Sequence, residues 1–535
     1  MEGPRIPRTF AVMSESVSGA FEAVIGLEVH VQMNTRSKAY SSDGYDYGAS
    51  PNTQISPITL GHPGTLPKAN AGVVRNAVRL GLACGCDIRE FNAYARKNYF
   101  YPDLPKGYQI TQDETPICSG GGIWISSETM APKRIGLTRI HMEEDTGKSI
   151  HDLDPFHTLL DLNRAGVPLL EIVSEPDFRS GEEAYLYLQE IRKLVRYLDI
   201  SDGNMEEGSL RCDVNISIRP VGREAFGTKI EVKNLNSFRN VQRAIDFEFD
   251  RQCAVLNAGG SLSQETRTFD AAKGRTTAMR SKEDANDYRY FIEPDLAPVR
   301  VTEALKAEIA EAMPPLPQAL VKRYQEELGL SRYDAQLLTE SKETALYYEA
   351  LLNTGCPAKS GANWLMGPVQ GWLNERAMDW TQWTLPARAL AGLIALVEDR
   401  TVSFSAAAQQ LFPLLVAQPD SDPRALAEAQ GLIQESDESA LLAHVDAALA
   451  AFPDKVAEYQ AGKKGLMGLF MGEVMKRSRG AAEPQILMRR RRVFIKGGRS
   501  RKGVQWIGVV LYNKLVYNTI QITTPCFHCT PLCRM

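Results

Sequence analysis

The sequence predicts an α+β fold in which a mostly antiparallel sheet is followed by helices. Within residues 20–295, short segments alternate apolar and polar residues, and a period of two is typical of a half-buried strand. After this region the alternation gives way to apolar residues at helical spacing, and Pro314, Pro315 and Pro317 mark the change. Short strands mixed with few helices favour an antiparallel sheet.

The composition is that of a globular protein with several domains. A chain of 535 residues allows about two to four domains with hydrophobic cores. Lys and Arg number 61 and Asp and Glu 65, and the net charge of −4 excludes a chain that coats nucleic acid by overall charge. No run of about 20 apolar residues predicts a membrane span. The nine scattered cysteines fit a reducing compartment.

Five segments carry the strand alternation, and their polar positions hold many carboxylates. In the first, Leu27, Val29 and Val31 share one face, so Glu28 and His30 share the other. An ordinary solvated strand face carries mixed polar residues, whereas repeated Glu, Asp and His predict a surface that binds cations. The five segments are Val24–Gln32, Arg139–Asp145, Leu169–Ser174, Leu210–Arg219 and Lys229–Lys233.

Helices are predicted where apolar residues recur every three or four positions. The first long one with clear periodicity lies between the third and fourth predicted strands, and another follows the fifth. The remaining helices lie in the second half of the chain. The predicted helices are Gly181–Leu198, Arg239–Asn257, Asp334–Leu338, Lys342–Leu352 and Gly465–Lys476.

The polar strand positions indicate metal-dependent phosphoryl transfer. Carboxylate ligands select Mg²⁺ or Mn²⁺, which neutralise phosphates while neighbouring Arg and Lys residues hold phosphate oxygens. Arg211 and Lys233 lie beside the acids and suit that role. Glu144 follows Glu143 directly, and regular alternation places its side chain on the opposite face of the strand unless a turn there re-aims it. The alternative interpretation is that these carboxylates are ordinary surface residues on a solvated strand face and bind no metal. The candidate metal ligands are Glu28, His30, Glu143, Glu171, Asp213 and Glu231.

Two aromatic and basic runs suit contacts with nucleotides. Arg96–Asp103 contains Lys97 and Tyr99, which suit phosphate contact and base stacking, and Asp287–Phe291 is similar. The alternative for both runs is an ordinary core strand followed by a turn. Near the end of the last predicted helix, Lys476 and Arg477 either face RNA phosphates or complement the helix C-terminus.

The final segment differs in kind from the rest. After Glu483 it contains no acidic residue and ten Lys and Arg, including the run Arg489–Arg492. Three interpretations stand: a nucleic-acid-binding tail, a metal knuckle, or a segment foreign to the fold such as a shifted reading frame. The spacing of the terminal cysteines fits no common zinc motif, which argues against the metal knuckle, and the foreign segment is the favoured interpretation.

These segments also carry a resemblance to a known family. Long motifs, in the expected order, resemble the B subunits of tRNA-dependent amidotransferases over roughly residues 20–488. The motifs are Val24–Gln32, Arg96–Gln109, His141–Asp145, Asn163–Asp177, Met205–Asp213, Glu231–Phe238, Gln264–Arg267 and Asp287–Phe291.

The resemblance implies a carbon–nitrogen ligase that uses glutamine as amido donor. With ATP and Mg²⁺ it would phosphorylate the side-chain carboxylate of Glu-tRNA(Gln) or Asp-tRNA(Asn), and ammonia would then displace phosphate. The implied partners are a glutaminase A subunit and a small C subunit in a heterotrimer, most simply in the bacterial cytoplasm, with an organelle as alternative. The family's metal positions map onto Glu28, His30, Glu143, Glu144, Glu171, Asp213 and Glu231.

Two rival functions remain from other classes. One is a non-catalytic tRNA-binding adaptor of the same complex. The other is a stand-alone metal-dependent phosphohydrolase.

The resemblance also implies a domain order. Residues 21–297 would form an antiparallel-sheet catalytic cradle resembling glutamine synthetase. An all-α linker domain at 298–400 and a small all-α, tRNA-binding tail domain at 401–488 would follow. The leader at 1–20 is expected to be disordered, and the basic segment at 489–535 departs from the family.

One further departure concerns zinc. Many family members carry two cysteine pairs that bind zinc near the start of the cradle. The matching positions here are Ser41, Asp43, Ser56 and Thr59, and hydroxyls are poor zinc ligands beside thiolates. We therefore expect no zinc at these positions.

Overall fold

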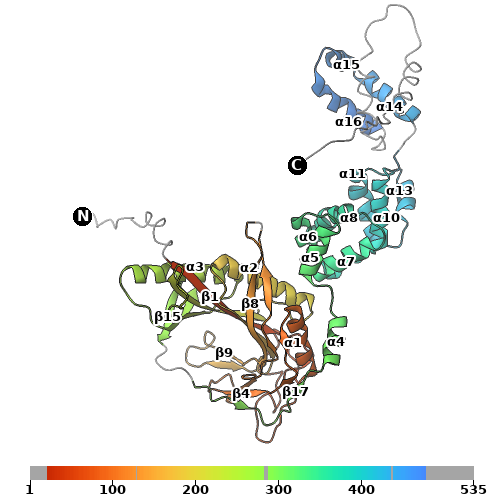
Figure 1. Ribbon diagram of the computed structural model, residues 1–535. Coiled ribbons are helices and arrows are strands. Elements are labelled where there is room, and N and C mark those ends of the chain that lie inside the picture. The colour runs from red at the N-terminus through yellow and green to blue at the C-terminus, as the bar shows by residue number, and fades with distance from the viewer. Residues whose placement is uncertain (1–20, 128, 282–286, 435–437, 478–535) are drawn as a thin grey trace, which may run out of the picture. The chain divides into compact units, whose positions relative to one another are not determined.

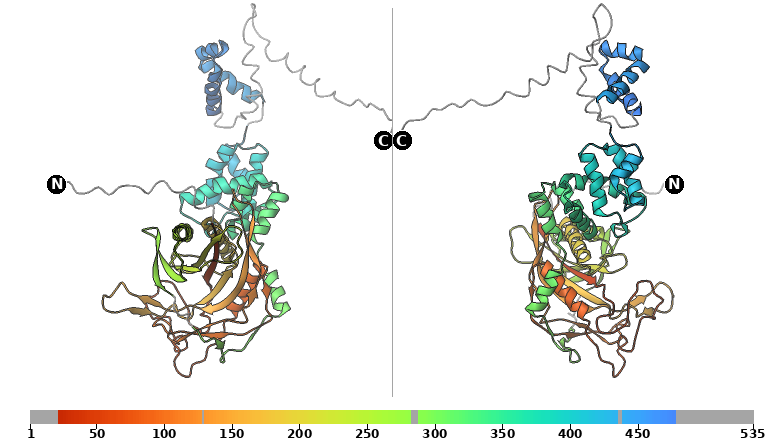
Figure 2. Two further views of the ribbon diagram at one scale, coloured as in Figure 1. Left: turned by 60° about the vertical axis from the view of Figure 1, so that its left-hand side comes forward. Right: turned by 90° about the vertical axis from the view of Figure 1, so that its right-hand side faces the viewer.

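The computed structural model describes residues 21–127, 129–281, 287–434 and 438–477. The chain forms two compact units that divide between Ala391 and Gly392. The first unit is mixed α/β, and the cyan-to-blue part of the chain contains helices (Figures 1 and 2). The predicted leader and basic tail lie outside the described residues. The predicted division into cradle, linker and tail, and the likeness to glutamine synthetase, stay predictions.

A ten-stranded sheet forms the centre of the first unit. Its order is β15-β14-β13-β12-β1-β11-β8-β6-β2, and β7 pairs with β8 beside this path. The strands are β1 (Phe21–Gln32), β2 (Asp87–Ile88), β6 (Cys118–Ser119), β7 (Gly122–Ile125), β8 (Lys133–Glu144), β11 (Pro168–Ser174), β12 (Leu210–Pro220), β13 (Ile230–Lys233), β14 (Glu265–Asp270) and β15 (Arg275–Ser281).

The sheet is mixed because one of its described pairings is parallel. β13 and β14 run in the same direction, whereas the other described neighbours are antiparallel. The helix α3 (Phe238–Asn257) connects β13 to β14, and a parallel pair requires such a crossover. All five predicted strands are present, as β1, β8, β11, β12 and β13, with ends that differ by a few residues.

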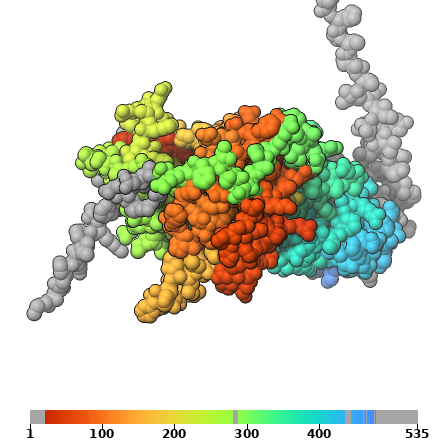
Figure 3. Space-filling model, turned by 90° about the horizontal axis from the view of Figure 1, so that it is seen from below, coloured from red at the N-terminus to blue at the C-terminus, as the bar shows by residue number. Residues whose placement is uncertain are grey.

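Smaller sheets extend the first unit. One has the order β16-β4-β5, and two others pair β10 with β9 and β17 with β3. The β9–β10 pair forms an arm that projects from the surface, drawn golden orange in Figure 3. The strands are β3 (Phe91–Asn92), β4 (Ala95–Asn98), β5 (Tyr108–Thr111), β9 (Lys148–Ile150), β10 (Leu159–Asp161), β16 (Phe291–Ile292) and β17 (Val299–Arg300).

Three helices pack on the apolar face of the sheet. α2 (Gly181–Tyr197) and α3 match their predictions, and each starts at a serine whose side chain accepts a hydrogen bond from the first turn. α1 (Ala71–Ala83) precedes both, so the first long helix begins earlier than predicted. Its two glycines and its valines lower its helix propensity, although its apolar residues keep helical spacing.

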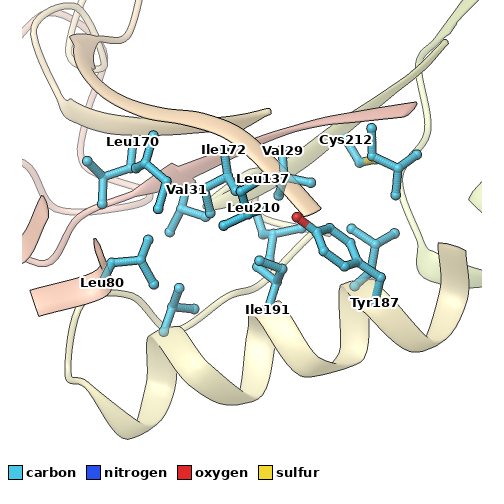
Figure 4. Packing of buried hydrophobic residues seen from close by; sticks show 14 of the residues in the cluster. Val29, Val31, Leu80, Leu137, Leu170, Ile172, Tyr187, Ile191, Leu210 and Cys212 are labelled. Carbon is cyan, nitrogen blue, oxygen red and sulfur yellow. The ribbon is translucent and has the colours of Figure 1, made fainter. Parts of the chain in front are cut away.

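The core lies between these helices and the sheet. Figure 4 shows Tyr187 and Ile191 of α2 pointing toward Val29, Ile172 and Leu210, which come from three adjacent strands. These five side chains are fully buried. Because one face of each strand is committed to this core, its alternate residues must face the opposite side.

The described elements after β17 are helices. The predicted helices at 334–338 and 342–352 are present as α6 and α7, and the one at 465–476 as a short 3₁₀ turn followed by α16. None of the described helices combines the length and apolar character needed to cross a membrane. The helices are α4 (Glu303–Glu311), α5 (Pro317–Glu326), α6 (Arg332–Leu338), α7 (Lys342–Leu352), α8 (Ala358–Trp364), η2 (Leu365–Val369), α9 (Gln370–Glu375), η3 (Trp380–Gln382), α10 (Ala387–Glu398), α11 (Phe404–Ala406), η4 (Ala407–Leu411), α12 (Phe412–Ala417), α13 (Pro423–Ala429), α14 (Glu438–Ala451), α15 (Pro453–Gln460), η5 (Lys464–Leu466) and α16 (Met467–Arg477).

A buried carboxylate attaches α3 to the outer edge of the sheet. Glu248 of α3 is fully buried. It forms ion pairs with Arg267 of β14 at 3.0 Å and with Arg251 at 2.8 Å, and it accepts a hydrogen bond from Thr276 of β15. Burial raises the pKa of Glu248, but the hydrogen bonds from Arg251 and Thr276 outweigh it and lower the pKa below its usual value.

We expect Glu248→Gln to destabilise the first unit by about 3 kcal/mol at neutral pH, because it removes the buried charge that pairs with Arg251 and Arg267 and leaves both arginines with Glu265 alone. A carboxyl with a lowered pKa stabilises the fold above its unfolded pKa of 4.5 and loses this contribution as the pH falls through the folded value. The difference from the unsubstituted protein should therefore shrink below that pH. Urea unfolding across this range measures it, with exposed Asp250→Asn on the same helix as control. A difference independent of pH would contradict the assignment.

Candidate active site

The polar face of the sheet borders a cavity of about 420 Å³. Side chains of β1, β8, β11, β12 and β13 line it, together with Lys97 and Tyr99 at β4 and with Tyr288 and Tyr290 just before β16. We call this the acidic cavity. Strand alternation placed five carboxylates and one histidine on this face, and all six line the cavity: Glu28, His30, Glu143, Glu171, Asp213 and Glu231.

Three neighbouring strands bring the first acidic cluster together: His30, Glu143 and Glu171. His30 of β1 lies opposite Glu171 of β11 in the register, and Glu143 of β8 lies two residues beyond His141, the partner of Glu171 on β8. His30 Nε2 lies 3.4 Å from a carboxylate oxygen of each acid. One ligand atom from each residue lies within 4.8 Å of the others, a separation that a single metal ion can span.

Two further strands add the second acidic cluster: Glu28, Asp213 and Glu231. Glu28 of β1 is paired with Asp213 of β12, and Glu231 lies on the adjacent β13. Their ligand atoms also lie within 4.8 Å of one another. Glu28 and His30 are two residues apart on the same face of β1, so both clusters open into the same cavity.

Histidines balance the charge of the first cluster. Burial lowers the pKa of His141, but its contacts with Glu143 and Glu171 outweigh burial and raise the pKa to about 9. The pKa of His30 is raised too, because the same two acids outweigh burial. With no cation bound, protonated His141 therefore offsets part of this carboxylate charge at neutral pH.

The two basic residues predicted to bind phosphate are held by carboxylates. Arg211 Nη2 lies 2.7 Å from Asp145, whose pKa is raised by burial but lowered overall by Arg211 and Arg164. Lys233 Nζ lies 2.7 Å from Asp213 and 3.1 Å from Glu231. Both cations line the acidic cavity, and their role toward phosphate stays a prediction.

An aromatic wall lies along the same cavity, formed by Tyr99, Tyr288 and Tyr290. Lys97 Nζ lies 4.8 Å from the centre of the Tyr288 ring and 5.8 Å from that of Tyr99. Burial, followed by the charges of Asp113 and Glu171, raises the pKa of Tyr290 to about 12, so its hydroxyl stays neutral.

The backbone fixes this wall. Arg289, between its last two tyrosines, has a φ of 46°, which is uncommon for a residue with a side chain. Asn98 donates a backbone hydrogen bond to the Tyr288 carbonyl at 2.9 Å, and its side chain donates to the Arg289 carbonyl at 2.7 Å. The wall thus joins segments almost 190 residues apart in the chain.

The remaining predicted residues lie elsewhere. β8 is regularly paired through Glu144, so this side chain points away from Glu143. It forms an ion pair with Lys106 and accepts a hydrogen bond from the backbone of Ile110 at 2.9 Å, and it lines a separate cavity of about 80 Å³. The structure therefore does not bring Glu144 into the acidic cavity.

The predicted tRNA-binding residues Lys476 and Arg477 end α16 in the second unit, where both are exposed. Arg477 Nε lies 2.9 Å from Glu473. Their contact with tRNA stays a prediction.

On β8 and its continuation, Arg139, His141 and Asp145 line the cavity but were not among the predicted site residues. All three share the odd-numbered face of β8 and its continuation with Glu143. The period-two alternation of this strand therefore already indicated that these side chains lie on the same face as Glu143.

Hydrogen bonds connect Ser41, Asp43, Ser56 and Thr59, the four residues at which no zinc is expected. The Asp43 carboxylate accepts from the Ser56 backbone at 2.9 Å and from the Thr59 hydroxyl. The Ser41 hydroxyl lies 3.1 Å from that of Thr59 and accepts from the Asp43 backbone. Burial raises the pKa of Asp43, but the hydrogen bonds from Thr59, Ser56 and Ser41 lower it overall. We call these four residues the Asp43 network.

Comparison with known proteins agrees with this architecture. Residues 23–307 match the GatB/GatE catalytic domain family, and residues 346–490 match the GatB domain family. The chain belongs to the GatB/GatE family.

Similar members come from several bacteria, and each is named as the B subunit of an aspartyl/glutamyl-tRNA(Asn/Gln) amidotransferase. The protein of Halorhodospira halophila is 51% identical over 468 residues, covering 87% of this chain and 97% of its own length. That of Alkalilimnicola ehrlichii is 50% identical over 467 residues, covering 87% and 97%. That of Synechococcus sp. strain JA-2-3B'a(2-13) is 49% identical over 471 residues, covering 87% and 96%.

Membership of the GatB/GatE family makes the chain the B subunit of an amidotransferase complex in translation. The matched catalytic domain contains both acidic clusters and the aromatic wall. The site is therefore part of the segment that this chain shares with the family.

We expect the Asp43 network to hold its loop without metal, so metal analysis of the purified protein should find far less than one zinc per chain. Asp43→Ala should speed proteolytic cleavage within residues 44–58, because each hydrogen bond to the carboxylate contributes about 1 kcal/mol near solvent. Asp43→Asn, which keeps one acceptor oxygen, should have a smaller effect. Stoichiometric zinc that is lost in Asp43→Ala would contradict this expectation.

Proposed function

We propose that this chain uses ATP to activate the side-chain carboxylate of a misacylated tRNA, Glu-tRNA(Gln) or Asp-tRNA(Asn), for amidation. The observation that carries the proposal is the pair of acidic clusters opening into one cavity that also contains basic and aromatic side chains. The names of its relatives, which combine these two tRNA types with amidotransferase activity, support the substrate class.

The chemistry requires activation because a carboxylate is a poor electrophile. A carboxylate oxygen of the aminoacyl side chain would attack the γ-phosphorus of ATP, and ADP would leave with the electron pair of the broken bond. The resulting acyl phosphate has a good leaving group. Ammonia would then attack the acyl carbon, release phosphate and, after losing a proton, leave the amide. Both reactants of the first step are anions, so the site must lower their mutual repulsion.

The donor set fits Mg²⁺, because each acidic cluster offers carboxylate oxygens at compatible separations and one adds an imidazole. His30, Glu143 and Glu171 would hold one ion, and Glu28, Asp213 and Glu231 a second. Mg²⁺ bound there would neutralise the phosphates and orient the reacting oxygens.

The chain's own residues would orient this arrangement. Lys233 holds Asp213 and Glu231 by ion pairs, and Asn215 donates a hydrogen bond to Glu28 at 2.8 Å. These contacts limit the rotamers of the second cluster, and such positioning lowers the cost of bringing reactants together. The aromatic wall would exclude water and stack a nucleotide base.

The proposal includes a complex. Ammonia would come from a separate glutaminase A subunit, and a small C subunit would complete a heterotrimer, since each relative is named as one lettered component of a larger enzyme. Together the subunits would act as a carbon–nitrogen ligase with glutamine as amido donor. A bacterial cytoplasm is the proposed location, in line with the bacterial relatives.

We expect Glu28→Gln and Asp213→Asn each to reduce ADP formation that depends on charged tRNA by roughly 10- to 100-fold, because each removes the negative charge of one carboxylate from the second cluster. The reconstituted heterotrimer should be assayed with Glu-tRNA(Gln) and Asp-tRNA(Asn). Binding of tRNA should persist, and exposed Glu182→Gln on α2 serves as control.

Unchanged ADP formation in both variants would instead favour a non-catalytic tRNA-binding adaptor. Phosphate release by the unsubstituted chain without charged tRNA or partner subunits would favour a phosphohydrolase.

A further inference from the structure

The positively charged side chains that line the acidic cavity differ in the groups that they contact. The lysines and arginines that line it are Lys97, Arg139, Arg211 and Lys233. Arg211 is paired with Asp145, and Lys233 with Asp213 and Glu231. Lys97 lies against the aromatic wall.

Among the described residues, Arg139 is paired with no carboxylate and lies against no aromatic ring. No described carboxylate lies within ion-pair distance of its guanidinium. Its Nε is buried and makes no hydrogen bond to the described part of the chain. A buried donor without a partner is costly, so such a group in a cavity indicates a ligand that completes its hydrogen bonds.

The position of Arg139 relates it to the first acidic cluster. On β8 it lies two residues before His141 and four before Glu143, on the same face of the strand. In the described structure this cluster is contacted by histidines but makes no ion pair with Lys or Arg. Arg139 is therefore the guanidinium available to an anion on this side of the cavity.

We propose that Arg139 binds an oxyanion of the reacting substrates, either the polyphosphate of ATP or the side-chain carboxylate that it activates. The proposal rests on the proposed function and assigns the anion contact to Arg139, because carboxylates already hold Arg211 and Lys233. A guanidinium presents parallel N–H donors that match two oxygens of a phosphate or carboxylate. Lysine keeps the charge but lacks this paired geometry.

The test measures kcat and KM for ATP and for Glu-tRNA(Gln) in the heterotrimer that carries Arg139→Lys or Arg139→Gln. Equilibrium binding of ATP and of adenosine, with Mg²⁺ present, accompanies the kinetics. Arg134→Lys is the matched control, since Arg134 is exposed on the same strand. Retained tRNA binding and an unchanged thermal midpoint show that each variant is folded.

We expect Arg139→Gln to weaken the binding of one substrate by roughly 10- to 100-fold, which corresponds to the loss of a charge-assisted hydrogen bond. The affinity of Arg139→Lys for that substrate should lie between those of Arg139→Gln and the unsubstituted protein. If the anion is the polyphosphate, ATP affinity falls while adenosine affinity is unchanged. If it is the carboxylate, KM for Glu-tRNA(Gln) rises and ATP affinity is unchanged. Added methylguanidinium should partly restore the activity of Arg139→Ala.

Arg139→Gln with unchanged KM values, kcat and ATP affinity would overturn this assignment. That outcome differs from failure of the proposed function, in which the unsubstituted heterotrimer forms no ADP in response to charged tRNA. In that case the ATP and adenosine binding measurements still decide whether Arg139 contacts phosphate.

Discussion

The register of the central strands is the constraint on which the site depends. Glu28 is paired with Asp213, and His30 with Glu171, only because β1 is aligned with β12 and β11 in this way. A slip of one residue would turn the carboxylates into the core and the valines of β1 toward solvent. Burial of each large apolar side chain contributes about 1.5–3 kcal/mol, so the core layer specifies this alignment strongly. The packing of α1, α2 and α3 thus determines which side chains meet in the acidic cavity.

Gathering carboxylates in one cavity has an electrostatic cost that the chain offsets in two ways. On one side, Lys233 forms ion pairs with two members of the second cluster, and Arg211 with Asp145. On the other, the raised pKa values of His30 and His141 supply positive charge to the first cluster. A metal ion in the first cluster would need the neutral imidazole of His30, so metal binding and protonation of His30 oppose each other. The negative charge of the first cluster is therefore offset by histidine protons, which a bound metal ion can displace.

Local periodicity predicted five of the ten strands of the central sheet and their faces, because alternation depends only on neighbouring residues. It also predicted that regular alternation would separate Glu144 from Glu143, which the pairing of β8 confirms. The helix α1 was not predicted because its glycines and valines lower its helix propensity, although its apolar residues keep helical spacing. Contacts between distant segments were beyond this reasoning. The aromatic wall needs Lys97 beside Tyr288, and nothing local to either run shows that they meet.

The buried Glu248 has a consequence for how the protein is made. Its partners Arg267 and Thr276 follow it in the chain by 19 and 28 residues, so α3 leaves the ribosome before the groups that neutralise its carboxylate. Until the β14–β15 hairpin has been synthesised, docking α3 would bury a charge paired with Arg251 alone. The outer edge of the sheet therefore closes late in synthesis, after the strands that hold both acidic clusters are already available to pair.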